Sequence, residues 1–179
     1  HLMDGAQIPK GSAITPLIAQ WIEQGCAIDL YSALPEALHR LGPVLCQLDV
    51  EQTRQLHQAM GSDPRAWSYF ISILQPAQAY DLQSCAAHFQ QHALTIHTTD
   101  RLRYYLRFAD TRIFCLLPQV MSALQWAAFS QCWSQWVYMD RHGKLQQLMA
   151  KSVKPLQNSD GLLWTDPQLE RLMDLTWPD

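Results

Sequence analysis

Apolar and polar side chains alternate most strictly over residues 101–108, which read Arg-Leu-Arg-Tyr-Tyr-Leu-Arg-Phe. This period of two predicts a strand with one buried face and one exposed face. The alternation stops before Asp110, whose carboxylate suits the N-cap of a short helix that must end near Pro118. Arg107 and Arg112 flank this aspartate, and either guanidinium can pair with it in a planar two-bond fork. The stretch therefore predicts a strand, a fixed turn and a helix in quick succession.

The rest of the chain alternates between strand-like and helix-like patterns. Asp49 with Gln52, and Ser122 with Gln125, have the spacing of capping boxes. Helical patterns cover residues 15–25, 34–41, 49–60, 76–92 and 122–131, and a last one starts at 165. Strand-like patterns cover 44–48, 67–73, 95–97 and 133–139, with the end of a first strand near residue 3 and a loop over 151–161. We expect an α/β (or α+β) fold in which helices cover a mixed sheet.

Composition narrows the class of protein. The 179 residues suit a single domain over 1–179, and 48% hydrophobic residues are ample for a core. Charged residues make up 16%, below the roughly 25% of average soluble domains. A lightly charged, aromatic-rich surface leans toward protein partners. The net charge of −3 predicts no general affinity for nucleic acid or anionic membranes.

The five cysteines are odd in number and widely spaced, without a C-x-x-C pair. We expect them to be reduced thiols, which favours a cytoplasmic location. No signal peptide and no apolar run of about 18 residues is visible, so we expect no membrane span.

Catalytic signals are weak. Asp4 precedes a glycine at a strand end, where a carboxylate can be either catalytic or a turn and cap residue. His88 and His92 lie four apart with His97 following, a spacing that can hold zinc, but no adjacent glutamate offers a base. Nucleotide-binding loops and nucleophile elbows are missing from the sequence. We expect no enzyme, no catalytic or metal-binding residue and no cofactor; an enzyme using Asp4 or the histidines is the alternative.

Two surfaces are candidates for binding. Trp133 and Trp136 have opposite parity on a predicted strand, so both cannot face the same side. One of them should lie on the outer surface, as a candidate partner anchor, or under a covering element. Tyr105 and Trp164 are further candidates for partner contact. The outward face of Arg101, Arg103, Tyr105 and Arg107 mixes basic and aromatic residues as single-strand nucleic-acid surfaces do, which is the other alternative.

Three stretches together resemble one known family. They are Met3-Asp4-Gly5-Ala6-Gln7-Ile8-Pro9, then Leu30-Tyr31 with Leu41-Gly42-Pro43-Val44-Leu45, and Arg107-Phe108-Ala109-Asp110-Thr111-Arg112 with Leu116-Leu117-Pro118. In this order they resemble the effector adaptors, or chaperones, of bacterial type VI secretion (Tap or TEC adaptors). Ala109 and Thr111 depart from that pattern, which more often has an aromatic residue before the aspartate and a proline after it.

The resemblance implies a cytoplasmic adaptor that acts by binding alone. Such a protein binds a toxic effector and helps load it onto the VgrG spike, without nucleic acid, membrane or cofactor. Family members often have a further C-terminal region, which a single domain over 1–179 would lack. The shared residues are expected to hold the shape of the domain: Asp4, Gly5, Gly42, Pro43, Arg107, Phe108, Asp110, Arg112 and Pro118.

Overall fold

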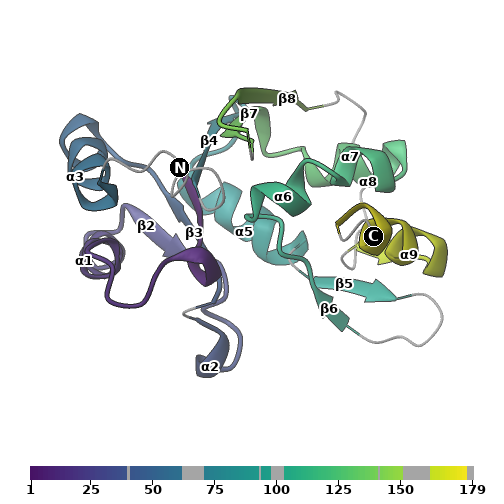
Figure 1. Ribbon diagram of the computed structural model, residues 1–179, viewed down its shortest axis with the longest axis horizontal. Helices are drawn as coiled ribbons and strands as arrows, with labels where there is room; N and C mark the ends of the chain where they lie inside the picture. The colour runs from purple at the N-terminus through teal and green to yellow at the C-terminus, as the bar shows by residue number, and fades with distance from the viewer. Residues whose placement is uncertain are drawn as a thin grey trace.

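The computed structural model describes residues 1–39, 41–61, 71–92, 94–97, 103–140, 142–150 and 162–176. Within these residues the larger sheet has six strands, and every neighbouring pair is antiparallel (Figure 1). From edge to edge they are β2 (Ala27–Asp29), β3 (Pro43–Cys46), β1 (Leu2–Asp4), β4 (Ile71–Pro76), β7 (Trp133–Met139) and β8 (Leu145–Met149).

A smaller sheet provides the parallel pairing. Its order is β6 (Arg103–Tyr105), β5 (Leu94–His97) and β9 (Leu162–Trp164), with β5 antiparallel to β6 and parallel to β9. The predicted fold class, α/β with helices covering a sheet, is confirmed.

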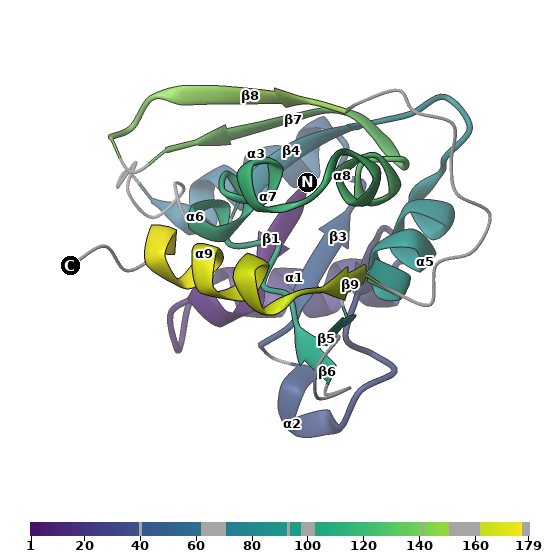
Figure 2. The same ribbon diagram turned by 90° about the vertical axis from the view of Figure 1, so that its right-hand side faces the viewer.

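Helices cover both faces of the larger sheet (Figures 1 and 2). One face carries α1 (Ile14–Glu23) and α3 (Val50–Met60). The other carries α5 (Leu82–His92), α6 (Thr111–Phe114), α7 (Leu117–Val120) and α8 (Ala123–Phe129). The remaining helical segments are η1 (Gly5–Gln7), α2 (Glu36–His39) and α9 (Asp166–Thr176). Both predicted capping boxes are confirmed, at Asp49 with Gln52 and at Ser122 with Gln125.

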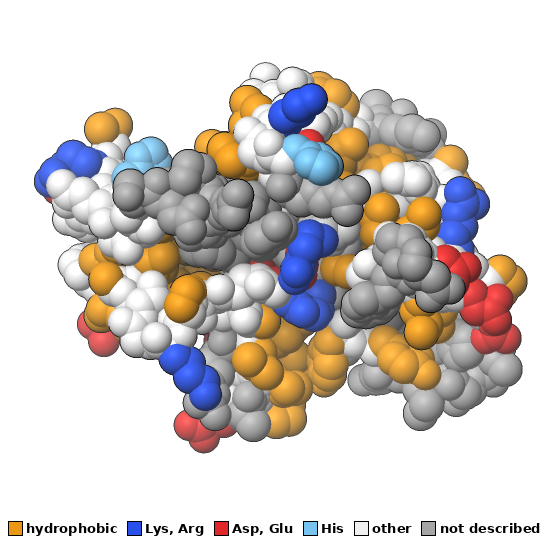
Figure 3. Space-filling model, in the orientation of Figure 1, with side chains coloured by type: hydrophobic (Ala, Val, Ile, Leu, Met, Phe, Trp, Pro, Cys, Tyr) orange, Lys and Arg blue, Asp and Glu red, His pale blue; other side chains and the backbone are white. Residues whose placement is uncertain are grey.

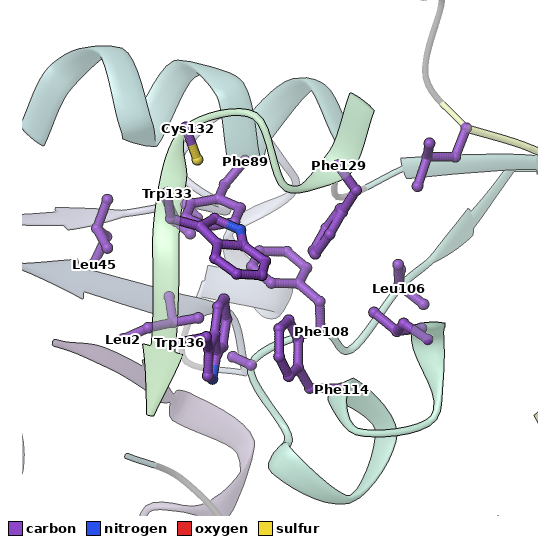
Figure 4. Packing of buried hydrophobic residues seen from close by; sticks show 14 of the residues in the cluster. Leu2, Leu45, Phe89, Leu106, Phe108, Phe114, Phe129, Cys132, Trp133 and Trp136 are labelled. Atoms are coloured by element: carbon purple, nitrogen blue, oxygen red, sulfur yellow. The ribbon is translucent and has the colours of Figure 1, made fainter. Parts of the chain in front are cut away.

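Strand alternation divides the core into two clusters. Leu2 packs on the α5–α8 face, whereas its neighbour Met3 packs on the α1–α3 face, because successive side chains point to opposite sides of a strand. The cluster on the α5–α8 side is rich in aromatic rings (Figure 4). In it Phe114 stacks on Trp136 at a centroid distance of 3.6 Å, and Phe89 stacks on Phe108 at 5.0 Å.

The prediction that Trp133 and Trp136 lie on opposite faces of the strand, with one of them as an exposed partner anchor, is wrong. Both are buried, with exposed fractions of 1% and 0%, and their rings lie 5.6 Å apart. The reason is a β-bulge: Gln135 pairs with Gln75, but the next pair joins Trp133 to Pro76, so one residue of β7 is left over. The extra residue shifts the alternation by one step and places both indoles on the core face.

The two other residues predicted to contact a partner, Trp164 and Tyr105, differ in exposure. Trp164 on β9 is 1% exposed, so it too belongs to the core, whereas Tyr105 is 42% exposed. The strand predicted through Phe108 ends at Tyr105, because the chain turns there toward Asp110. Strands β2, β8 and β9 were not predicted. Residues 67–70 of the strand predicted over 67–73, and the predicted loop over 151–161, lie outside the described residues.

A pair of buried histidines lies on α5. The rings of His88 and His92 are 4.4 Å apart, and Nε2 of His88 bonds the carbonyl oxygen of Phe129 at 2.9 Å. Burial lowers the pKa of both imidazoles, and that of His92 falls to about 4, with His88 as a further cause. At mildly acidic pH the unfolded chain therefore binds protons that the folded chain does not.

We expect the free energy of unfolding to fall as the pH drops from about 6.5 to about 4, by roughly 3 kcal/mol for His92. Chemical denaturation over a series of pH values measures this slope. His92→Gln should remove most of it, while the same change at the exposed His57 should leave it in place. A slope that survives in His92→Gln would contradict this assignment.

Candidate functional site

The turn after β6 is fixed by Asp110. This carboxylate caps α6 by accepting from the backbone N–H of Arg112 at 3.0 Å. The Arg112 side chain returns to the same carboxylate, with Nε 2.9 Å from Oδ1 and Nη2 2.6 Å from Oδ2. The expected fork is thus made by Arg112, while Nη2 of Arg107 lies 3.4 Å from Oδ2. Pro118 lies in the first turn of the next helix, α7, and α6 itself ends at Phe114.

Arg107 also reaches across the fold to the first motif. Its Nη2 donates to Oδ2 of Asp4 at 2.8 Å, although the two residues are 103 positions apart in sequence. Asp4 ends β1 and accepts from the N–H of Ala6 at 3.2 Å. Of the two roles considered for it, catalytic carboxylate or turn and cap residue, the structure shows the second. The side-chain oxygen of Gln7, turned toward the guanidiniums, accepts from Arg107 at 3.0 Å and Arg112 at 2.8 Å.

The second motif closes the same junction. The N–H of Gly5 donates to the carbonyl of Gly42 at 3.2 Å, and Pro43 is the register partner of Asp4. Tyr31 packs over Gly42 so closely that a Cβ at that position would lie 2.7 Å from the tyrosine side chain. The Tyr31 ring also contacts the ring of Tyr105, with centroids 5.7 Å apart.

We call this meeting point the motif junction. It consists of Asp4, Gly5, Gln7, Tyr31, Gly42, Arg107, Asp110 and Arg112. Two carboxylates and two guanidiniums balance in charge. The side chains of Asp4 and Asp110 are 4% and 2% exposed, and those of Arg107 and Arg112 are 46% and 47% exposed. The acidic groups are therefore buried, and the basic groups lie between them and solvent.

Burial dominates the electrostatics of the motif junction. It raises the pKa of Asp4, and the neighbouring Arg107 opposes that rise. Burial also raises the pKa of Tyr31 to about 12, with the charge of Asp4 as a second cause. Both carboxylates accept from arginine and from backbone N–H groups, an arrangement that suits joining chain segments.

An apolar groove of about 890 Å³ opens beside the motif junction. It lies between η1, α1 and the segment from β2 to β3, and Gly5 and Gly42 of the junction form part of its wall. Further lining residues are Ile8, Pro9, Ile18, Ala19, Ile22, Leu41 and Val44, with Lys10, Asp29 and His39 as polar groups. Figure 3 shows, in the orientation of Figure 1, basic side chains near the middle of the molecule with hydrophobic side chains beside them.

The structure describes only part of the alternative sites predicted from sequence. His88 is bonded to a backbone carbonyl and packs on His92, while the side chain of His97 lies outside the described residues. Among the described residues, no three His, Cys, Asp or Glu side chains lie close enough together to hold a metal ion. In the arginine row, Arg107 turns inward to Asp4, and Arg101 and the side chain of Arg103 lie outside the description.

A family model described as "Domain of unknown function (DUF4123)" matches residues 2–128. The chain belongs to the DUF4123 family. The match spans all three motifs, so the motif junction lies wholly inside the DUF4123 domain, whereas β7, β8, β9 and α9 follow it. Neither the curated proteins nor the solved structures contain a match. No helix in the described ranges combines the length and apolar character needed to cross a membrane.

Sequence reasoning missed the groove and the pairing of Asp4 with Arg107. Both depend on contacts between segments far apart in the DUF4123 domain. The only local signals are the spacing of Ile18 and Ile22 on one side of α1 and the glycine at residue 42, which indicates a close approach.

Asp110→Ala should lower the free energy of unfolding by ~1–3 kcal/mol, because it removes a helix cap and the carboxylate that pairs with the Arg112 guanidinium. Asp49→Ala is the matched control, because it removes an exposed N-cap whose carboxylate holds no arginine. Urea unfolding of both variants should show the larger loss at Asp110. An unchanged melting temperature together with lost partner binding would instead make Asp110 a contact residue.

Gly42→Ala should destabilise the fold by ~1–3 kcal/mol, because the new methyl group overlaps the Tyr31 side chain. Leu41→Ala changes the neighbouring, half-exposed residue and should cost much less. Thermal unfolding monitored by circular dichroism separates the two. Equal melting temperatures for the two variants would show that Tyr31 moves aside freely.

Proposed function

We propose that this protein is a type VI secretion effector adaptor, which binds an effector in the bacterial cytoplasm and helps load it onto the VgrG spike by binding alone. Membership of the DUF4123 family supports this, as does the ordered set of motifs that resembles the Tap or TEC adaptors. The observation that carries the proposal is the apolar groove whose wall includes the motif residues Gly5 and Gly42.

The groove suits a polypeptide segment with apolar side chains. Ile22 and Leu41 line it and are 41% and 49% exposed, so a partner that covered them would remove apolar surface from water. The groove is partly open to solvent rather than enclosed, which fits a chain segment laid along it better than a small molecule enclosed in it. Arg107 bonds Asp4 and Gln7, and Arg112 bonds Gln7. Asp4 and Gln7 flank Gly5 and Ala6 of the groove wall, so the family motif has a positioning role in the proposed binding.

The test is co-purification with the effector encoded beside this protein, followed by measurement of affinity. Ile22→Glu and Leu41→Glu should each weaken binding by about 30-fold, which corresponds to ~2 kcal/mol, because each buries a charge in an apolar contact. Met173→Glu is the control outside the groove, since it alters an apolar side chain on α9 that is 61% exposed.

Binding should also raise the melting temperature of the adaptor with increasing effector concentration, because the effector binds only the folded state. Three results together would overturn the adaptor function: no effector co-purifies, the melting temperature stays constant, and the isolated protein turns over a small molecule. Binding that survives both groove variants but fails in Met173→Glu would move the effector site to α9.

A further inference from the structure

The larger sheet ends in an exposed strand, β8. It pairs with β7 on one side, and in the described part of the chain no strand pairs with its other side (Figure 2). Leu145 and Met149 are 72% and 56% exposed on the outer face, while Leu148 packs toward the core. Strand β8 therefore presents both an open edge and an apolar outer face.

The hydrogen bonds to β7 show which backbone groups point outward. The N–H of Asp140 donates to the carbonyl of Lys144, and the N–H of Ala150 donates to the carbonyl of Ser134. In an antiparallel pair the bonded residues alternate, so even-numbered residues of β8 bond to β7. The N–H and C=O groups of Leu145, Gln147 and Met149 consequently point away from the sheet.

This edge lacks the features that usually prevent strands from joining. Its sequence, Leu-Gln-Gln-Leu-Met, contains no charge and no proline, and its register with β7 is regular over five pairs. The opposite edge strand, β2, has three residues and carries Asp29, which lies 3.9 Å from His39. Its short length and its charge disfavour pairing of β2 with another strand, whereas the edge of β8 is open to such pairing.

The composition of β8 fits a second copy of itself. In an antiparallel pair centred on Gln147, Leu145 faces Met149 of the second copy and Gln147 faces its own counterpart. All three outward N–H and C=O pairs on each chain then find partners, and no two like charges meet. We propose that two copies of this chain join through their β8 edges in this register, forming one continuous sheet.

The dimer is independent of the proposed adaptor function, since β8 lies outside both the groove and the DUF4123 match. A single five-residue strand offers a small contact, so the association should be reversible and depend on concentration. The apolar contact between Leu145 and Met149 of the second copy adds to the backbone bonds on the outer face.

Sedimentation velocity over a wide range of protein concentration tests the proposal. Wild-type protein should shift from monomer to dimer, and Gln147→Pro should weaken dimerisation at least about tenfold by removing an outward N–H. Gln147→Thr keeps that N–H and a neutral strand-forming side chain, so it should dimerise like wild type. Because residue 147 does not bond to β7, all three proteins should have similar melting temperatures.

Cysteine cross-linking tests the register. In the proposed pair the two Cα atoms of residue 147 are about 5.5 Å apart, which is within disulfide range. Oxidised Gln147→Cys should form a covalent dimer above the wild-type background, and Leu145→Cys alone should not. A mixture of Leu145→Cys with Met149→Cys should form the mixed dimer.

Four results would overturn the proposal. They are a monomer at every concentration, a dimer unaffected by Gln147→Pro, cross-linking of Leu145→Cys alone, and a monomer in which Gln147→Pro abolishes effector binding. The last result would assign the β8 edge to a strand of the effector.

Discussion

The fold depends on one guanidinium held between two buried carboxylates. Arg107 bonds Asp4 at 2.8 Å and lies 3.4 Å from Asp110, so it joins the end of β1 to the start of α6. Burying a carboxylate is costly, and its ion pair roughly offsets that cost, so such a cluster adds little net stability. Losing one member, however, leaves a buried charge without a partner. The cluster therefore specifies the arrangement of the chain, because an alternative packing of these segments would leave the buried Asp4 without Arg107, whereas Asp110 would keep the nearby Arg112.

This constraint also positions the aromatic core. Phe108 follows Arg107 directly, and Phe114 ends the helix that Asp110 caps, so fixing the charged groups places both rings. Phe108 then stacks on Phe89, and Phe114 stacks on Trp136 from the distant strand β7. Buried aromatic rings contribute large hydrophobic area together with a preferred geometry. In one short segment, Arg107 and Asp110 thus fix the arrangement of the chain, while the neighbouring Phe108 and Phe114 supply apolar contacts that stabilise it.

The sequence predicted those structural features, such as helix caps, that depend only on residues close together in the chain. The caps at Asp49, Asp110 and Ser122 were predictable because a cap needs only a side chain and the next turn of helix. The burial of both Trp133 and Trp136 was not, because the bulge arises where β7 passes Pro76, a residue distant in sequence that has no N–H to bond. Strand β8 was missed because its neutral glutamines between apolar residues give little contrast. The Asp4–Arg107 pair depends on how β1 and the β6–α6 turn meet, which no local pattern records.

The two surfaces proposed for binding lie at opposite ends of one sheet. The groove is lined by Asp29 of β2 and Val44 of β3, whereas β8 is the last strand at the other end. Four strands separate β2 from β8 in the sheet order, so a chain in the groove does not obstruct the β8 edge. A dimer joined through β8 would therefore place its two grooves at the two far ends of the continuous sheet. If both proposals hold, dimerisation changes the number of effectors carried by each assembly without changing the affinity of either groove, because the two sites share no residue.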